Sequence, residues 1–131
     1  MRLHHVQVCC PPGGEDVART FWADGLGLSE VDKPEPLRGR GGAWFRAYDD
    51  SGGVTCEVHV GVEDPHQPVR KGHPALLLDD AAALDAAGER LAGLGFEVDA
   101  AERETFPGHV RLHVRDGHGN RVELLATPAG D

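Results

Sequence analysis

Cysteine is scarce in this chain of 131 residues, which contains only three. Cys9 and Cys10 are adjacent and Cys56 stands alone, so the sequence lacks the CxxC pairs that hold zinc or form a redox disulfide. The spacing excludes a disulfide-dense scaffold and favours a reduced, cytoplasmic compartment. We therefore expect the three thiols to be small buried side chains rather than nucleophiles.

Long apolar runs are also missing. The run Leu76-Leu77-Leu78 is followed at once by two aspartates, and no charged segment leads into an apolar one near the start of the sequence. These patterns predict neither a membrane span nor a secretory signal peptide.

Positive charge is the third deficit. Thirteen Lys and Arg residues stand against 22 Asp and Glu residues, which gives a formal net charge of −9. An acidic surface repels nucleic acids and anionic membranes, so neither is expected as a partner. A neutral or cationic small molecule is the kind of ligand that this overall charge favours.

What the chain does contain is an internal duplication. The spacing that separates His5 from His73 also carries Leu26-Gly27-Leu28 onto Leu94-Gly95-Phe96. At nearly the same spacing, the stretch from Asp50 that contains Glu57 matches the stretch from Asp116 that contains Glu123. Each copy therefore returns one imidazole and one carboxylate at matching places, and these are metal-ligand types.

Both copies are predicted to fold in the order βαβββ. Apolar periodicity and turn residues place the strands at 3–8, 28–31, 43–48 and 54–62 in the first copy and at 73–78, 96–101, 109–115 and 120–126 in the second. The helices are predicted at 15–24 and around 84–94, the second with Asp80 as its N-cap. The result is an α+β chain with one module over about 1–63 and another over about 72–127. A proline-rich linker between them favours one compact domain over residues 1–131.

Strand alternation predicts which side chains share a face. In the first strand, Val6 and Val8 alternate with His5 and Gln7, which leaves His4 on the apolar side. A helix must cover the apolar face of each sheet, so the other face is expected to be concave and open to a ligand. His5 is therefore a better candidate ligand than His4.

The same alternation applies to the two strands that carry glutamate. In 54–62 the valines occupy one face, and Glu57 and His59 occupy the other. In 120–126, Glu123 lies opposite Val122 and Leu124. The ligand face would therefore carry both carboxylates and His59.

Further candidates for ligand contact are Trp44 and a few polar side chains, which are Gln7, Arg40, His59 and Arg111. Trp44 and Phe45 point to opposite faces of their strand, so only one of them can line the pocket. Arg40 and Arg111 lie near the expected mouth, where a guanidinium can clamp a carboxylate or phosphate. The competing interpretation places the aromatics in the core and the arginines in solvent.

The stretch Asp116-Gly117-His118-Gly119-Asn120-Arg121-Val122-Glu123-Leu124, together with His5-Val6, Gly25-Leu26-Gly27-Leu28 and His73, resembles the vicinal-oxygen-chelate superfamily. This superfamily includes glyoxalase I, methylmalonyl-CoA epimerase, extradiol dioxygenases, fosfomycin-resistance thiol transferases and bleomycin-resistance proteins. The long stretch is similar to the family's Asp-Pro-x-Gly-Asn-x-x-Glu turn and strand, with Gly117 in place of proline. The resemblance covers nearly the whole chain and implies two βαβββ modules in a curved, cup-shaped mixed sheet, with the helices on its convex side.

By that resemblance the metal positions of the family fall on His5, Glu57, His73 and Glu123. Two imidazoles and two carboxylates suit a borderline divalent ion such as Zn, Ni, Co, Mn or Fe. Glu57 or Glu123 would be the catalytic base. The assignment of Glu57 as a ligand leaves alternatives open. His59 could take its coordination position, the site could have three ligands, or Glu57 could be a solvated strand carboxylate.

Two functions follow from the resemblance. One is a metal-dependent enzyme of the lyase or isomerase kind, acting on a small oxygenated or thiol-conjugated substrate. The other is a metal-free protein that binds and sequesters an antibiotic or another small molecule, as bleomycin-resistance relatives do. A single βαβββ unit cannot close a cup, so two units are expected to pair within the chain or to swap across a homodimer. Both arrangements occur in relatives, and a homodimer is the assembly expected here.

Overall fold

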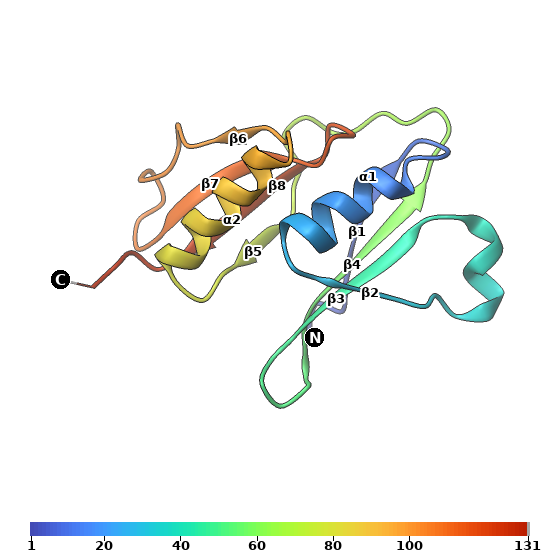
Figure 1. The fold of residues 1–131 in the computed structure, drawn as a ribbon, viewed down its shortest axis with the longest axis horizontal. Coiled ribbons are helices and arrows are strands. Elements are labelled where there is room, and N and C mark those ends of the chain that lie inside the picture. Colours follow the sequence, from blue (N-terminus) through green and yellow to red (C-terminus); the bar gives the residue numbers. More distant parts are fainter. Residues whose placement is uncertain (131) are drawn as a thin grey trace. The chain divides into compact units, whose positions relative to one another are not determined.

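The computed structural model describes residues 1–130 and forms two compact units, the first covering Met1–Pro68 and the second beginning at Val69. In each unit a helix lies on a small sheet (Figure 1). No helix within residues 1–130 is long and apolar enough to cross a bilayer.

The first unit contains a four-stranded mixed sheet. Its elements are β1 (Val6–Cys10), α1 (Glu15–Arg19), a π-helical segment (Thr20–Gly25), β2 (Ser29–Val31), a 3-10 helix (Glu35–Arg40), β3 (Ala43–Tyr48) and β4 (Val54–Val62). The strand order is β1-β4-β3-β2, with β1 parallel to β4 and the other neighbours antiparallel.

The second unit repeats this topology. Its elements are β5 (Ala75–Leu77), α2 (Ala81–Gly93), β6 (Val98–Asp99), β7 (Val110–Arg115) and β8 (Arg121–Ala126). The order β5-β8-β7-β6 is that of the first sheet, with β5 parallel to β8. The α+β class with two βαβββ modules is thereby confirmed.

One face of each sheet forms the core of its unit. In the first unit Val58 and Val60 of β4 are buried together with Phe45 of β3 and with Phe21 and Trp22 of the helical segment. In the second, α2 packs on β7 and β8. The helix starts where its sequence predicts, because the Asp80 carboxylate accepts a 2.7 Å hydrogen bond from the Ala83 amide as an N-cap.

Both candidate histidines precede their strands, which corrects the sequence prediction. The first strand begins at Val6 rather than Leu3, and β5 begins at Ala75 rather than His73. Strand alternation therefore does not govern His4 and His5, because neither belongs to the pleated segment. The orientation of each ring is set by local contacts instead.

An aspartate-centred turn leads into each glutamate-bearing strand. Asp116 Oδ1 accepts hydrogen bonds from the His118 and Asn120 amides at 2.9 and 3.1 Å, and the Asn120 side chain donates to Asp116 Oδ2 at 2.7 Å. In the first unit Asp49 Oδ1 accepts from the amides of Ser51 and Gly53. The turn carboxylate is thus Asp49, not Asp50 as the sequence match suggested. The pairing of β3 with β4 shifts between Ala47 and Tyr48, which accommodates the extra residue of the first unit.

Candidate functional site

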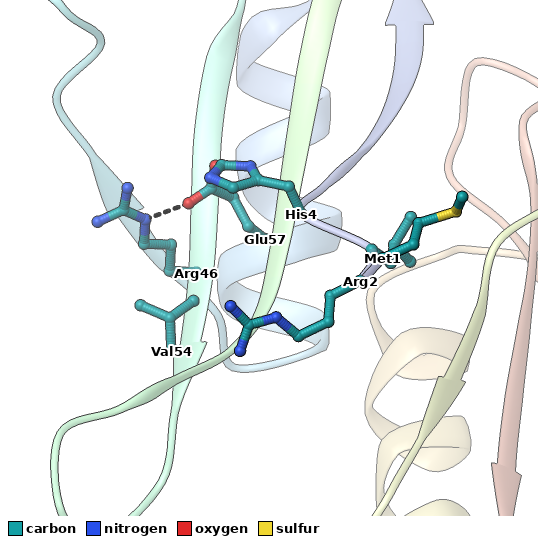
Figure 2. Close-up of a pocket in the computed structure, with 7 residues that line it drawn as sticks. Met1, Arg2, His4, Arg46, Val54 and Glu57 are labelled. Atoms are coloured by element: carbon teal, nitrogen blue, oxygen red, sulfur yellow. Dashed lines mark hydrogen bonds and ion pairs between the residues drawn. The ribbon is translucent and has the colours of Figure 1, made fainter.

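In the first unit the candidate site is built around Glu57 in the middle of β4. Arg46 of β3 is its register partner, and the Arg46 Nε donates a 2.5 Å hydrogen bond to Glu57 Oε1 (Figure 2). His59 Nε2 lies 2.8 Å from Glu57 Oε2. Because Glu57 is only 7% exposed and both its oxygens are bonded, it is not a solvated strand carboxylate.

These partners set the charges of the site. Burial raises the pKa of the Glu57 carboxyl, but the hydrogen bonds from His59 and Arg46 and their charges outweigh it, so the pKa lies below its usual range. Burial also lowers the pKa of His59, and the hydrogen bond to Glu57 offsets only part of that effect. At neutral pH the pair is therefore a carboxylate and a neutral imidazole that donates its Nε2 proton.

His4 and His5 lie together beside this carboxylate. Their Nδ1 atoms are 2.9 Å apart, and His4 Nδ1 lies 3.7 Å from Glu57 Oε2. His4, His5 and Glu57 each offer a ligand atom, and the three atoms lie within 4.8 Å of one another. The sequence ranked His4 below His5 by strand alternation, and the structure places the two imidazoles in the same cluster.

Three flat side chains form a stack next to the cluster. The rings of Trp44 and His59 are parallel within 1° with centroids 3.7 Å apart, and His59 stacks on His5 at 3.9 Å and 18°. Trp44 faces His59 across the β3–β4 pair, while Phe45 is fully buried in the core. The prediction that only one of these two aromatics faces the site is consistent with this arrangement. His59 is therefore held by its hydrogen bond to Glu57 and by stacking between the rings of Trp44 and His5.

The second unit contains a similar cluster around Glu123 of β8. His113 of β7 is its register partner, and His113 Nε2 lies 3.1 Å from Glu123 Oε1. His73 Nε2 lies 3.9 Å from the same oxygen. His73 Nδ1 is 2.6 Å from the Lys71 carbonyl oxygen, which can only accept, so Nδ1 is the donor and the neutral form of the ring has its lone pair on Nε2.

Arg111 completes the second cluster. Its Nη1 donates to Glu123 Oε1 at 2.7 Å, its Nη2 donates to Thr105 Oγ1 at 2.7 Å, and its Nε donates to the Glu102 carbonyl at 3.0 Å. In each unit the glutamate is therefore hydrogen-bonded to one guanidinium and one imidazole, and a second imidazole lies within 4 Å. The positions are exchanged: the arginine is the register partner of Glu57, whereas the histidine is the register partner of Glu123.

His113 is the site residue that sequence reasoning missed. No motif marks it, because the residue that lies opposite Glu123 is set by the register between β7 and β8. His113 is 7% exposed, and burial lowers its pKa, as does the charge of Arg121. Glu123 offsets part of the shift. A neutral imidazole at this position is available as a hydrogen-bond partner or as a metal ligand.

The structure brings His5 together with Glu57 in the first unit, and His73 together with Glu123 in the second. Two other predicted contact residues lie outside these clusters. Gln7 is exposed on β1 with its side-chain amide beside Gly61, and Arg40 is exposed at the end of the 3-10 helix.

The donor sets fit a divalent ion. Metal bonds from imidazole nitrogen and carboxylate oxygen are about 2.0–2.2 Å long, so ligand atoms around one ion lie roughly 3 to 4.4 Å apart. The separations of 3.1 and 3.9 Å to Glu123 Oε1 fall within that range. In the first unit His4 Nδ1 lies 3.7 Å from Glu57 Oε2, which is within that range, and 2.9 Å from His5 Nδ1, which is at its lower limit. Nitrogen and oxygen donors of this kind select Zn, Ni, Co, Mn or Fe over Ca or Mg.

The fold and the paired clusters define a known class. Residues 2–124 match the model of the Glyoxalase/Bleomycin resistance protein/Dioxygenase superfamily, and the chain belongs to this family. The resemblance to the vicinal-oxygen-chelate fold is thereby confirmed. No curated protein shows a significant match to the chain.

Solved structures with the same fold include proteins with different described roles. A glyoxalase family protein from Bacillus anthracis is 34% identical, with a TM-score of 0.78 over 97% of this chain and 99% of that one. The lactoylglutathione lyase from Agrobacterium tumefaciens is 21% identical, with a TM-score of 0.67 over 96% and 94%. TnmS3, an antibiotic-binding protein from Streptomyces sp. CB03234, is 22% identical, with a TM-score of 0.64 over 97% and 98%.

Proposed function

We propose that the protein is a divalent-metal-dependent, glyoxalase-like enzyme of the lyase or isomerase kind, which removes a proton from a small oxygenated substrate. The observation that carries the proposal is the Glu123 cluster, where two imidazole nitrogens lie 3.1 and 3.9 Å from one buried carboxylate oxygen. The lactoylglutathione lyase from Agrobacterium tumefaciens shows that this fold accommodates lyases.

The residues proposed to bind divalent metal are His5 and Glu57 within the first unit and His73 and Glu123 within the second. A bound divalent ion would act as a Lewis acid on an oxygen of the substrate. The hydrogen bond from His73 Nδ1 to the Lys71 carbonyl supports this assignment, because such bonds fix the tautomer and the ring orientation of metal-binding histidines.

Of the two glutamates, Glu123 is the better candidate base. Both oxygens of Glu57 are bonded, to Arg46 and to His59, and its lowered pKa makes it a weak proton acceptor. In the Glu123 cluster Arg111 and His113 both contact Oε1, and among residues 1–130 no hydrogen bond to Oε2 is found. Oε2 can therefore take a proton from the substrate while Oε1 stays anchored.

Metal content is the test of this proposal. Protein purified without chelators is expected to carry a stoichiometric transition metal, and the metal-stripped protein should regain thermal stability when Ni, Zn, Mn or Fe is added. The proposal is overturned if the purified protein contains no metal and gains no stability from any of these ions.

A second candidate function is metal-free binding of a flat small molecule. The specific observation in its favour is the parallel stack of Trp44, His59 and His5, whose geometry suits aromatic recognition. TnmS3, described as an antibiotic-binding protein, has the same fold. This function predicts that polycyclic antibiotics raise the melting temperature of metal-stripped protein and that Trp44→Leu removes the effect. A screen of such antibiotics in which none raises the melting temperature would count against this function.

A further inference from the structure

The segment of residues 100–109, between β6 and β7, is tied to Arg111 of β7. The Arg111 side chain donates from Nε to the Glu102 carbonyl at 3.0 Å and from Nη2 to the Thr105 hydroxyl at 2.7 Å. The Arg111 amide donates to the Arg103 carbonyl at 3.0 Å. Two side-chain bonds and one backbone bond therefore fix where Arg111 lies relative to this segment.

These bonds divide the donors of the Arg111 guanidinium among different acceptors. Its third nitrogen, Nη1, donates to Glu123 Oε1 at 2.7 Å. Pairs of arginine and carboxylate are frequently bidentate, with two parallel N–H···O bonds. Here a single bond forms, because Thr105 holds Nη2 and the Glu102 carbonyl holds Nε. Arg111 thus binds one oxygen of Glu123 and leaves Oε2 uncovered.

The Thr105 hydroxyl is itself oriented by Glu102. Its oxygen lies 2.6 Å from Glu102 Oε2 and 3.1 Å from the Glu102 carbonyl oxygen, so its single proton is directed at Glu102. The lone pairs of the hydroxyl are then available to accept the Nη2 proton of Arg111. Thr105 therefore acts on Arg111 as an acceptor, a role that an aliphatic side chain of the same shape cannot fill.

The carboxylate of the first unit shows the closed alternative. Glu57 Oε1 accepts from Arg46, and Glu57 Oε2 is bonded to His59, so neither oxygen is open. In the second unit Arg111 and His113 both contact Oε1 of Glu123. The open oxygen is found where residues 100–109 hold the guanidinium aside.

We propose that Thr105 is a positioning residue, which keeps Glu123 Oε2 open by holding Arg111 Nη2. Without the hydroxyl, Nη2 is free to turn onto Oε2, and the ion pair becomes bidentate. The charge of Arg111 is the same in both arrangements, so the effect comes from the position of the guanidinium alone. This inference rests on the proposed function, because it concerns the glutamate that is proposed to act as the base and to bind metal.

The experiment compares two substitutions of Thr105. Thr105→Val keeps the shape and removes the hydroxyl, whereas Thr105→Ser keeps the hydroxyl. Thr20→Val is the matched control, because it makes the same change in the first unit, where the Thr20 hydroxyl donates to the Asp16 carbonyl at 3.1 Å.

The first readout needs no metal. In metal-stripped, isotope-labelled protein, the NMR signal of the Glu123 carboxyl carbon is identified by its absence from Glu123→Gln, and it responds to the donors that the carboxylate accepts. We expect Thr105→Val to shift this signal, because Oε2 gains a donor. Thr105→Ser and Thr20→Val should leave it in place. A loss of stability without a change at the site would not move it.

The second readout is metal affinity, measured by isothermal titration with Ni or Zn. Thr105→Val should weaken binding about tenfold, the lower end of the range for loss of an outer partner of a metal ligand, because the ion then competes with two guanidinium bonds instead of one. Thr105→Ser should restore the affinity of the unaltered protein.

A shifted carboxyl signal and weaker metal binding in Thr105→Val, both restored in Thr105→Ser, support the proposal. An unshifted signal in Thr105→Val, an equal shift in Thr105→Ser, or metal binding by Thr105→Val as tight as that of the unaltered protein overturns it. If the unaltered protein binds no metal, the proposed function fails, and the carboxyl signal alone decides this inference.

Discussion

His113 and Glu123 face each other across neighbouring strands, with His113 Nε2 3.1 Å from Glu123 Oε1. Neither residue is more than 7% exposed, so the contact is shielded from water. A carboxylate in such a position requires partners, and it has two, because Arg111 binds the same oxygen. Two predictions follow from this cluster, and two more follow from contacts elsewhere in the chain.

Removing the Glu123 charge should abolish tight metal binding. Glu123→Gln leaves a neutral amide beside His73 and His113, and the loss of affinity should exceed the roughly 10- to 100-fold that is typical when an outer partner of a ligand is lost. Isothermal titration with Ni or Zn measures it. Glu97→Gln removes the same charge from an exposed position of the second unit and should leave the affinity unchanged. Equal affinities of the two variants would show that Glu123 is not a ligand.

Arg111 should matter for stability as well as for the site. Arg111→Gln leaves the Glu123 carboxylate buried with one partner fewer, which should cost about 1–3 kcal/mol in the free energy of unfolding. Urea denaturation of metal-stripped protein measures this. Arg103→Gln breaks the more exposed ion pair with Asp85 and should cost less than about 1 kcal/mol. A cost no larger for Arg111→Gln than for Arg103→Gln would contradict the role of Arg111 as the anchor of Glu123.

The N-cap of α2 gives a local prediction. Asp80→Ala removes the acceptor for the Ala83 amide and should destabilise the protein by about 1 kcal/mol, whereas Asp80→Asn keeps an acceptor and should cost less. Asp79→Ala, at the exposed position before the cap, is the control. Thermal unfolding followed by circular dichroism would rank the stabilities of these variants. An Asp80→Ala variant as stable as the unaltered protein would refute the prediction.

The Cys9 thiol should react slowly at neutral pH. Burial raises its pKa, and the charge of Glu63 and the hydrogen bond to Glu63 raise it further. Because only the thiolate reacts, alkylation at a given pH should be slower than for an exposed thiol, and its rate should still be rising with pH where that of the exposed thiol levels off. Glu63→Gln should shift the rate profile to lower pH. Tandem mass spectrometry separates Cys9 from Cys10, and an unshifted profile would contradict the prediction.

Much of the fold could be predicted because local patterns determine it. The bounds of β3 and β4 agree with the predicted 43–48 and 54–62, where apolar alternation is strong and glycines punctuate the ends. Asp80 was predicted as an N-cap from its place before an alanine-rich helix. The π-helical geometry of Thr20–Gly25 could not be foreseen, because an apolar stripe does not distinguish it from an ordinary helical turn.

The site was less predictable because it depends on the register between paired strands. Glu57 and Glu123 were found through the duplication, but their burial and their guanidinium partners arise from strand register. His113 had no local signal at all. His4 was misjudged because alternation was extended to residues that precede β1. The ring stack of Trp44, His59 and His5 likewise joins β3, β4 and the segment before β1.

The placement of the tryptophans makes the two units separately observable. Trp22 is fully buried in the helical segment and Trp44 stacks on His59, so both of the chain's tryptophans belong to the first unit. Intrinsic tryptophan emission therefore follows the unfolding of the first unit alone, while circular dichroism follows both. Coincident denaturation curves would mean that the duplicated halves unfold as one cooperative body, and separated curves would measure how much stability each half has by itself.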